Sequence, residues 1–338
     1  MFKNNRYGWL AILIGSALLS GCAAYPSVFT PQSTNSQEIY RLILIIFSIA
    51  AGVFVIVEGA LIYAAVRFSR GKQAGLPKQV EGNNKLEIAW TMAPAIVLAF
   101  VFVISLPTLR SLTTQPAVVA GVTGKTVLKV HVVAHQWWWE FDYPDLKIVT
   151  ANELYVPVNT VVSLDLESVD VIHSFWIPPL GGKIDVIPGQ VNHTWFQVTQ
   201  AGGYVGQCSE FCGIDHAFMR FEVVAESQDE FTSWTRLMQA QALVMSGEGA
   251  QGEQVFLAGT CSACHTIDGT SAQGKMGPNL THFASRMKFA GWTVDNTPEN
   301  LAKWLANPQD VQPGTLMPNL HLSQDQIQQL VVYLESLK

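Results

Sequence analysis

Two long apolar runs near the N-terminal end restrict most strongly what this chain can fold into. Residues 42–66 contain a single charged side chain, Glu58, and residues 88–106 contain none. Each run is close to the roughly 20 residues that a helix needs to cross the hydrocarbon core of a bilayer. We therefore expect two transmembrane helices, at about 40–66 and 87–107.

The charges between the two runs predict how this hairpin, assigned to residues 22–110, is oriented. From residue 67 to residue 85 there are five basic residues, Arg67, Arg70, Lys72, Lys78 and Lys85, and Glu81 is the only acid. Cytoplasmic loops carry an excess of Lys and Arg, so this loop is expected inside and everything after the hairpin outside. Charged residues form only 14% of the chain, against roughly 25% in typical soluble proteins, which also favours contact with lipid.

Residues 1–21 have the features of a secretory signal peptide. Lys3 and Arg6 precede the apolar run WLAILIGSALL, and small residues follow it. The ending LLSGCAA resembles a bacterial lipobox, which implies cleavage before Cys22 and lipidation of its thiol. An ordinary signal peptide or a first membrane span is the alternative. The five cysteines cannot all pair internally, in agreement with a lipidated Cys22. We expect a bacterial cytoplasmic-membrane protein with periplasmic domains.

Two acids belong to the hairpin. Glu58 lies inside a span, where a carboxylate is a functional hypothesis by default, although packing against a partner helix is the simpler interpretation. Glu87 stands at the cytoplasmic mouth of the second span. From its position alone, Glu87 is a solvated acid at a helix start, which also suits the helix dipole.

Residues 117–225 are expected to form β structure. Segments such as VLKVHVVAHQWWWEFDY, VVSLDLESV and MRFEVVA are rich in β-branched and aromatic residues, and turn signals such as PVNT and QAGG separate them. Regularly spaced short strands predict a sandwich or a barrel.

A dense group of metal-ligand residues closes this region, in QCSEFCGIDHAFMR. Cys208 and Cys212 are compatible with a disulfide, with zinc or with two buried thiols. His216 and Met219 follow in the same loop, and His173 precedes it. Thiolate and thioether ligands together favour copper over zinc. A blue-copper centre needs only one cysteine, so the second suggests two coppers bridged by two thiolates.

The C-terminal region, residues 247–338, follows a polar linker at 226–246 that is expected to be partly helical. It contains CSACH at residues 261–265, the C-x-x-C-H pattern of covalent haem c attachment. Cys261 and Cys264 would form thioethers and His265 would bind the iron; a free redox C-x-x-C pair is the alternative. An exported location and a mostly helical pattern favour haem.

The second axial ligand of the haem iron is expected downstream. Met317, in TLMP, fits the pattern of small class I cytochromes c. Met276 is only eleven residues after His265, and Met287 lacks the flanking motif. Met/His ligation raises the iron potential, which suits a relay towards copper. The chain ends in an amphipathic segment, QDQIQQLVVYLESL, expected to pack on the first helix of this domain.

The motifs CSEFCGIDHAFM, HSFWIP and HQWWWEFDY closely resemble cytochrome c oxidase subunit II and its binuclear copper centre. The resemblance implies two bridging thiolates, one histidine on each copper, a weak thioether ligand and a backbone carbonyl ligand. In that order these are Cys208 and Cys212, His173 and His216, Met219, and Glu210. The side chain of Glu210 would then be free for a magnesium ion shared with a partner subunit.

The same resemblance assigns further roles. Trp137 would be an exposed residue where electrons from a cytochrome enter, whereas Trp138 and Trp139 are interpreted as core. No motif supports His131, His135 or His193 as a metal ligand, and all three are interpreted as structural. The sequence LEIAWTMAPAIVLAFVFVISLPTLR resembles the second span of that family, which makes Glu87 a proton-uptake residue for the catalytic subunit.

The resemblance covers nearly the whole chain. It implies a multidomain membrane protein with a two-helix hairpin, a cupredoxin-like β-sandwich and an all-α class I cytochrome c domain. The expected function is electron relay from cytochrome c or another periplasmic donor, through haem c, to the copper pair. Subunit I, accompanied by subunit III, would then reduce oxygen to water with proton pumping, so this chain is part of an oxidoreductase.

Other functions are less compatible with the residues. A quinol oxidase subunit II would lack the copper ligands, and a copper-storage or chaperone protein would not need haem c. Nitrous oxide reductase uses a similar copper pair, but nothing here resembles its catalytic domain. A net charge of −6 without a basic patch argues against a nucleic-acid partner.

Overall fold

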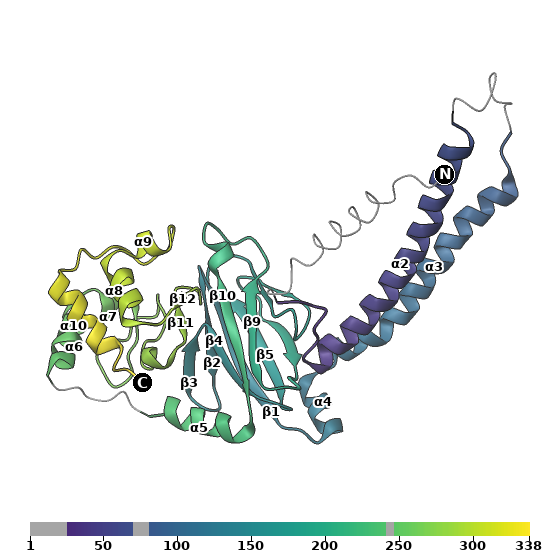
Figure 1. Ribbon diagram of the computed structural model, residues 1–338. Coiled ribbons are helices and arrows are strands. Elements are labelled where there is room, and N and C mark those ends of the chain that lie inside the picture. Colours follow the sequence, from purple (N-terminus) through teal and green to yellow (C-terminus); the bar gives the residue numbers. More distant parts are fainter. Residues whose placement is uncertain (1–25, 70–80, 241–246) are drawn as a thin grey trace, which may run out of the picture.

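The computed structural model describes residues 26–69, 81–240 and 247–338 (Figure 1). The predicted signal peptide and Cys22 lie outside the described residues, as do residues 70–80 of the basic loop and 241–246 of the linker. Figure 1 shows three parts in sequence order: an elongated helical hairpin, a central β-sandwich and a smaller helical domain on the side of the sandwich away from the hairpin.

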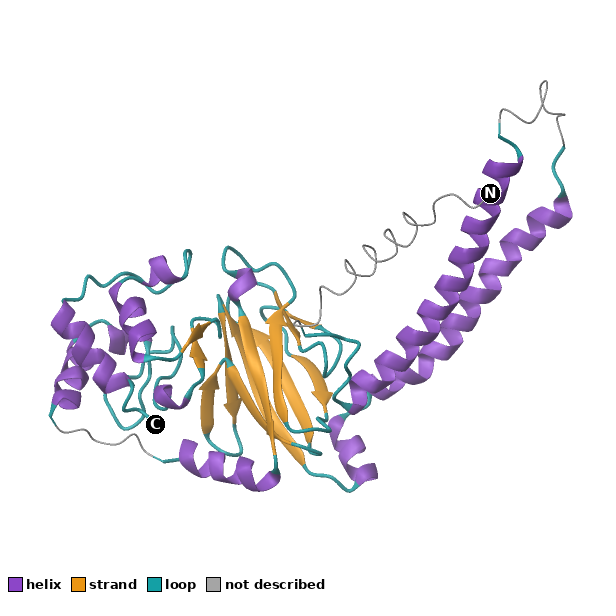
Figure 2. Ribbon diagram, viewed as in Figure 1, coloured by secondary structure: helices purple, strands orange, loops and turns teal. Residues whose placement is uncertain are grey.

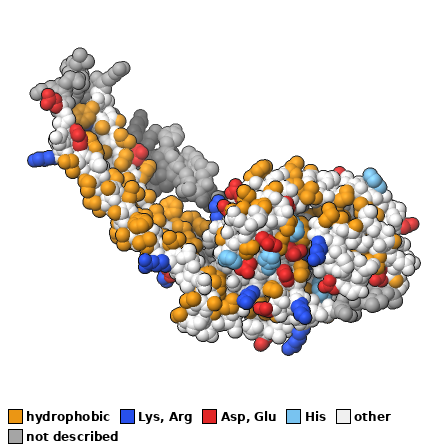
Figure 3. Space-filling model, turned by 180° about the vertical axis from the view of Figure 1, so that it is seen from behind, with side chains coloured by type: hydrophobic (Ala, Val, Ile, Leu, Met, Phe, Trp, Pro, Cys, Tyr) orange, Lys and Arg blue, Asp and Glu red, His pale blue; other side chains and the backbone are white. Residues whose placement is uncertain are grey.

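The hairpin consists of α2 (Thr34–Arg67) and α3 (Asn84–Thr113). Both helices are long and apolar enough to cross a membrane. Their apolar side chains are exposed along the whole length (Figure 3). With 34 residues, α2 is about 51 Å long, whereas the hydrocarbon core is only about 30 Å thick. Both helices are longer than the predicted spans. Polar residues at their ends continue the helices beyond the apolar runs.

The start of α2 is joined to the sandwich by hydrogen bonds. Ser33 caps the helix and its hydroxyl donates to the carbonyl of Leu180. The side-chain amide of Asn35 donates to the carbonyl of Trp195 over 3.1 Å. Ser33 and Asn35 are both buried, at 0% and 4% exposure. Because breaking buried hydrogen bonds leaves polar groups without water, this joint resists bending.

The central domain is built from two five-stranded sheets packed face to face (Figure 2). The first sheet contains, in spatial order, β3 (Ile148–Ala151), β2 (Trp138–Tyr143), β1 (Val127–His135), β5 (Val161–Ser168) and β8 (Asn192–Phe196). The second contains β4 (Glu153–Pro157), β10 (Arg220–Glu226), β9 (Gly202–Cys208), β6 (His173–Trp176) and β7 (Ile184–Val186). The predicted β-sandwich is thereby confirmed.

Each sheet contributes alternate side chains to one apolar core. Strand β5 shows the period of two, since Val162, Leu164 and Leu166 are fully buried. Trp139 from β2 lies in the same core as Phe221 from β10, with ring centroids 5.5 Å apart. These apolar layers hold the strand ends that carry the site residues in fixed positions.

Two helices flank the sandwich. Helix α4 (Pro116–Thr123) precedes β1, at a point where the sequence pattern predicts only β structure. Helix α5 (Gln228–Met238) forms within the expected linker and inserts Phe231 and Trp234 into the sandwich core. The Trp234 ring stacks on Tyr155 at 4.6 Å between centroids. This segment is therefore partly helical, as expected, and it packs against the sandwich.

The C-terminal domain is mainly helical and has its own apolar core. Its helices are α6 (Glu248–Ala258), α7 (Cys261–Cys264), α8 (Pro298–Ala306), α9 (Pro308–Val311) and α10 (Gln324–Leu334). A two-stranded ribbon completes it, formed by β11 (Lys288–Phe289) and β12 (Val294–Asp295). Helix α10 packs on α6, as its amphipathic sequence predicts, with Phe256 against Tyr333.

Replacing Gly252 with alanine should destabilise the C-terminal domain. A Cβ atom there would lie 2.0 Å from the carbonyl oxygen of Gln329, so α6 and α10 would have to separate. Overpacking of this kind costs roughly 1–3 kcal/mol, measurable as faster amide hydrogen exchange across α10. Gly121→Ala in α4 is the control, because no atom lies within 4 Å of its Cβ position. Equal exchange in the two variants would contradict this packing.

Candidate functional site

The candidate metal-ligand residues come from two neighbouring strands and the loop that follows one of them. Strand β6 begins at His173, strand β9 ends at Cys208, and the two strands pair with each other. The short helix η1 (His216–Phe218) then returns the chain to β10. Sheet pairing therefore brings His173 beside a loop that starts 35 residues later in the sequence.

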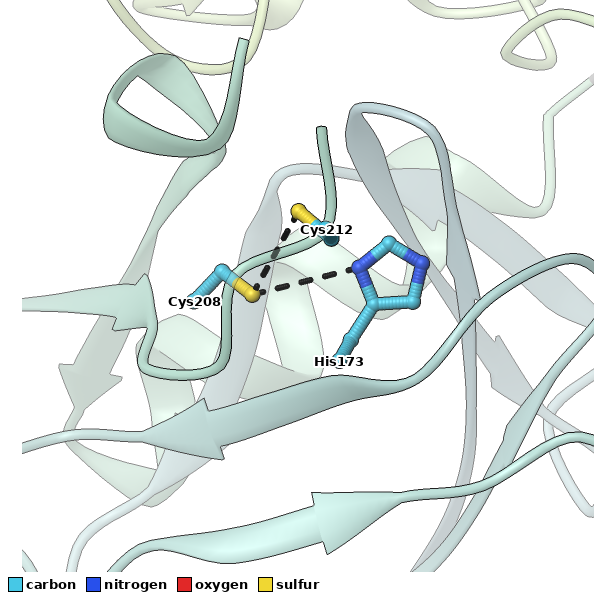
Figure 4. Close-up of side chains that lie close together, drawn as sticks. All are labelled: His173, Cys208 and Cys212. Atoms are coloured by element: carbon cyan, nitrogen blue, oxygen red, sulfur yellow. Dashed lines mark hydrogen bonds between the residues drawn. The ribbon is translucent and has the colours of Figure 1, made fainter. Parts of the chain in front are cut away.

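The side chains of this cluster converge on one buried point (Figure 4). The Sγ atoms of Cys208 and Cys212 lie 3.8 Å apart, and neither cysteine is in a disulfide. Each sulfur also faces one histidine. The distance is 3.9 Å from Cys208 Sγ to His173 Nδ1 and 3.5 Å from Cys212 Sγ to His216 Nδ1. The structure thus brings together two sulfurs and two imidazoles in two matched pairs.

Two weaker donors complete the cluster. The Sδ atom of Met219, which is fully buried, lies 3.8 Å from Cys212 Sγ. The carbonyl oxygen of Glu210 lies 3.2 Å from Cys208 Sγ, on the other side of the pair. Residue Glu210 is exposed. The donor set is soft, buried and nearly symmetric about the two sulfurs, which fits two copper ions better than one zinc.

An acid that the sequence reasoning missed orients one of the histidines. Asp170 Oδ1 accepts a hydrogen bond from His173 Nε2 over 2.8 Å, which leaves Nδ1 free to face the sulfur. Burial disfavours the His173 cation, but the hydrogen bonds with Asp170 and Cys208 outweigh it and raise the pKa of His173. An acid three residues before the histidine is a faint signal that sequence alone could have offered.

The two thiols influence each other's ionisation. A hydrogen bond from Cys212 stabilises the thiolate of Cys208 and lowers its pKa, while the same contact raises the pKa of Cys212. Without a cation between them, two thiolates 3.8 Å apart in a buried site repel each other. The pair is therefore suited to a site in which positive charge lies between the sulfurs.

The tryptophan motif divides between core and site. Trp138 and Trp139 are 7% and 0% exposed, which confirms their assignment to the core. Trp137 is half-buried, more covered than the resemblance implies, and its indole Nε1 donates to the carbonyl of Cys212 over 3.0 Å. The side chain of Gln136 donates to the same oxygen over 2.7 Å. Trp137 thus connects directly to the cluster through one hydrogen bond.

The three histidines interpreted as structural, His131, His135 and His193, contact aromatic or acidic side chains of the sandwich. The ring of His135 stacks on Trp138 at 4.1 Å between centroids. His131 and His193 form surface pairs with acids on the first sheet, His193 with Asp165 over 2.6 Å. Burial lowers the pKa of His135 to about 4, so the ring against the tryptophan is neutral at neutral pH.

A largely apolar cavity of about 390 Å³ lies mainly in the C-terminal domain. Cys261, Cys264, His265 and Met317 all line it. His265 Nδ1 donates to the carbonyl of Pro278 over 2.8 Å, so the other ring nitrogen is left for a ligand. Burial lowers the pKa of His265, which keeps the imidazole neutral as metal ligation requires. The cavity, its cysteines and its neutral histidine fit a covalently attached haem.

Met317, the expected second axial ligand, lines the same cavity as His265. Trp304 Nε1 donates to Met317 Sδ over 3.0 Å, which holds this thioether at the cavity wall. Met276 and Met287 are 77% and 59% exposed, as expected for surface side chains. Gly277 contributes differently, because a Cβ there would lie 2.5 Å from the His265 ring. Only a glycine allows the backbone to cover the histidine this closely.

The cavity is not closed by the C-terminal domain alone. Gln136, Trp137, Trp138 and Asn152 of the sandwich line it together with the cytochrome-like residues. Trp137 therefore stands between the cavity and the thiol cluster.

Glu87 lies far from the cavity and the thiol cluster. It is exposed in the first turn of α3, at the end of the hairpin away from the sandwich (Figure 1).

Three family models match successive parts of the chain. Residues 26–108 match the cytochrome c oxidase subunit II transmembrane domain, and residues 147–227 match its periplasmic domain. Residues 249–338 match cytochrome c. The matches follow the three parts of the structure in order, and they support copper in the sandwich and haem c in the C-terminal domain.

Several curated proteins are similar over almost the full length. Cytochrome c oxidase subunit 2 of Alkalihalophilus pseudofirmus is 34% identical, covering 95% of this chain and 94% of the relative. The protein of the same name from Bacillus sp. strain PS3 is 38% identical, covering 98% and 96%. That of Bacillus subtilis is 35% identical, covering 100% and 99%. Since similarity at this level runs through hairpin, sandwich and haem domain together, the chain belongs to the cytochrome c oxidase subunit II family, as its motifs predict.

Proposed function

We propose that this chain relays electrons in a bacterial terminal oxidase, from a periplasmic donor to the subunit that reduces oxygen. As a member of its family, it is a membrane-anchored subunit of an oxidoreductase complex of the haem–copper type, with its two globular domains on the outer side. The observation that carries the proposal is the placement of Trp137, which lines the haem-type cavity and donates a hydrogen bond to Cys212.

The residues of this chain divide the work between two sites. Cys208, Cys212, His173 and His216 would hold two copper ions, with Met219 and the Glu210 carbonyl as weaker ligands. Cys261, Cys264, His265 and Met317 would hold haem c. When bound, copper and haem supply reversible one-electron carriers. The chain contributes a rigid, dry surrounding that limits rearrangement when charge arrives or leaves.

Further proposed roles concern partners. The side chain of Glu210, which is exposed, would hold a magnesium ion shared with a partner subunit. Glu87, exposed at the cytoplasmic end of α3, would pass protons to subunit I. Subunit III and cytochrome c, or another periplasmic donor, are the remaining proposed partners, and lipidation of Cys22 would add a second membrane anchor.

Purifying the full chain in detergent after expression with copper and haem should test this function. We expect two coppers and one haem per chain, a mixed-valence two-copper EPR signal and a low-spin haem c spectrum. Rapid reduction of the haem should be followed by reduction of the copper pair. A single-copper signal, a zinc-filled cluster or a haem that does not exchange electrons with copper would overturn the proposal.

A further inference from the structure

The C-terminal domain contacts the sandwich through specific hydrogen bonds. The amide of Met287 donates to Glu153 Oε1 over 2.7 Å, and the amide of Arg220 donates to the carbonyl of Gly291 over 3.0 Å. Both are bonds between a backbone donor of one domain and an acceptor of the other. The two domains are therefore held in one arrangement, and their contact is more than loose apposition.

One contact of this interface joins the two ligand loops themselves. Gln312 Nε2 donates to Asp215 Oδ2 over 2.8 Å, and the two residues are 5% and 0% exposed. Asp215 directly precedes His216 in the copper-type loop. Gln312 follows α9 and lies five residues before Met317. A buried acid–amide pair thus links the segment of one proposed metal ligand to the segment of another.

The backbone of the C-terminal domain also packs closely against the copper-type loop near this pair. Gly314 has a φ of +104°, and a Cβ there would lie 2.5 Å from Ile214 Cγ2. Gly291 has a φ of +61°, and its Cβ would lie 2.3 Å from the carbonyl oxygen of Phe218. Both glycines belong to the C-terminal domain and both contact the loop before β10. Side chains at these positions would force the domains apart.

We infer that Asp215 and Gln312 form a positioning pair that fixes the haem domain against the copper loop with Trp137 between them. This inference rests on the proposed function.

Adding a carboxylate at Gln312, and then removing the one at Asp215, tests the pair. Gln312→Glu places two carboxylates in contact, and losing a buried hydrogen bond should shift the docking equilibrium about tenfold towards the open form. In the full-length holo-protein, the Met287 and Arg220 amides should exchange hydrogen about tenfold faster, and haem-to-copper transfer should slow. The double variant Asp215→Asn with Gln312→Glu restores an acid–amide pair, so both quantities should return towards their original values.

Gln329→Leu is the control. The Gln329 side-chain amide donates to Gln251 within the C-terminal domain, so its loss should not speed exchange at Met287. Unchanged exchange and transfer in Gln312→Glu, or no recovery in the double variant, would overturn the inference. Copper and haem spectra of the unmodified chain test the proposed function separately, since hydrogen exchange reports docking whether or not electrons move.

Discussion

Replacing Cys212 with serine should abolish the two-copper spectrum and stop electron transfer beyond the haem. Cys212 Sγ lies within 3.8 Å of three donor atoms of the cluster, Cys208 Sγ, His216 Nδ1 and Met219 Sδ. A serine hydroxyl is a hard donor that stays protonated at neutral pH, so it cannot replace a bridging thiolate. Changing even an outer partner of a metal ligand costs roughly 10- to 100-fold in affinity, and losing a bridge should cost more.

The measurements are copper content and EPR of the full chain, with haem-to-copper transfer after rapid reduction. Ser209→Ala is a suitable control in the same loop, because its hydroxyl makes no hydrogen bond within the described part of the chain. The haem spectrum should be unchanged in both variants, which shows that the chain has folded. Retention of a two-copper signal in Cys212→Ser would contradict the bridging role.

Replacing Met317 with histidine should strongly lower the reduction potential of the haem. Electron transfer from haem to copper would then become more favourable, and reduction of the haem by the donor would become the slow step. Methionine ligation raises the potential relative to bis-histidine ligation, and axial ligands as a whole cover a range of about 0.8 V. A drop on the order of 0.1 V or more is expected. Reduction by a weak periplasmic donor should then become slow, while the copper spectrum is unchanged.

Redox titration of the bound haem measures this effect. Met276→His is the matched control, since this methionine also borders the cavity but is 77% exposed. Trp304→Phe should give a smaller change, because it removes only the hydrogen bond to Met317 Sδ. If Met276→His lowered the potential and Met317→His did not, the assignment of the second axial ligand would be wrong.

Much of this architecture could be predicted because its signals are local. Uncharged runs of sufficient length determine the hairpin, and alternating β-branched residues indicate the strands. The C-x3-C and C-x-x-C-H spacings place their ligands within one loop or one helical turn. Met219 and His216 belong to the same loop as Cys212, so their convergence needs little information about the rest of the fold.

What the sequence did not predict depends on contacts between distant segments. Asp170 becomes important only because β6 pairs with β9 and turns His173 towards the sulfurs. The bond between Asp215 and Gln312 spans 97 positions and two domains. Asp215 lies within the copper motif but is not one of its expected ligands, and Gln312 lies outside both motifs. Helix α5 contains polar residues typical of a linker, and only the packing of Trp234 reveals that it belongs to the sandwich. Tertiary packing determines these contacts, and local sequence propensity does not predict them.

The hydrogen-bonded joint at Ser33 and Asn35 has a consequence for the assembled oxidase. Because buried hydrogen bonds join the start of α2 to the sandwich, the depth of the hairpin in the bilayer also sets the height of the thiol cluster above the lipid. Rates of long-range electron tunnelling fall steeply with separation, so a constant height favours a constant gap to the next carrier. A few buried side chains at one helix start thus tie the position of the thiol cluster to that of the hairpin in the membrane.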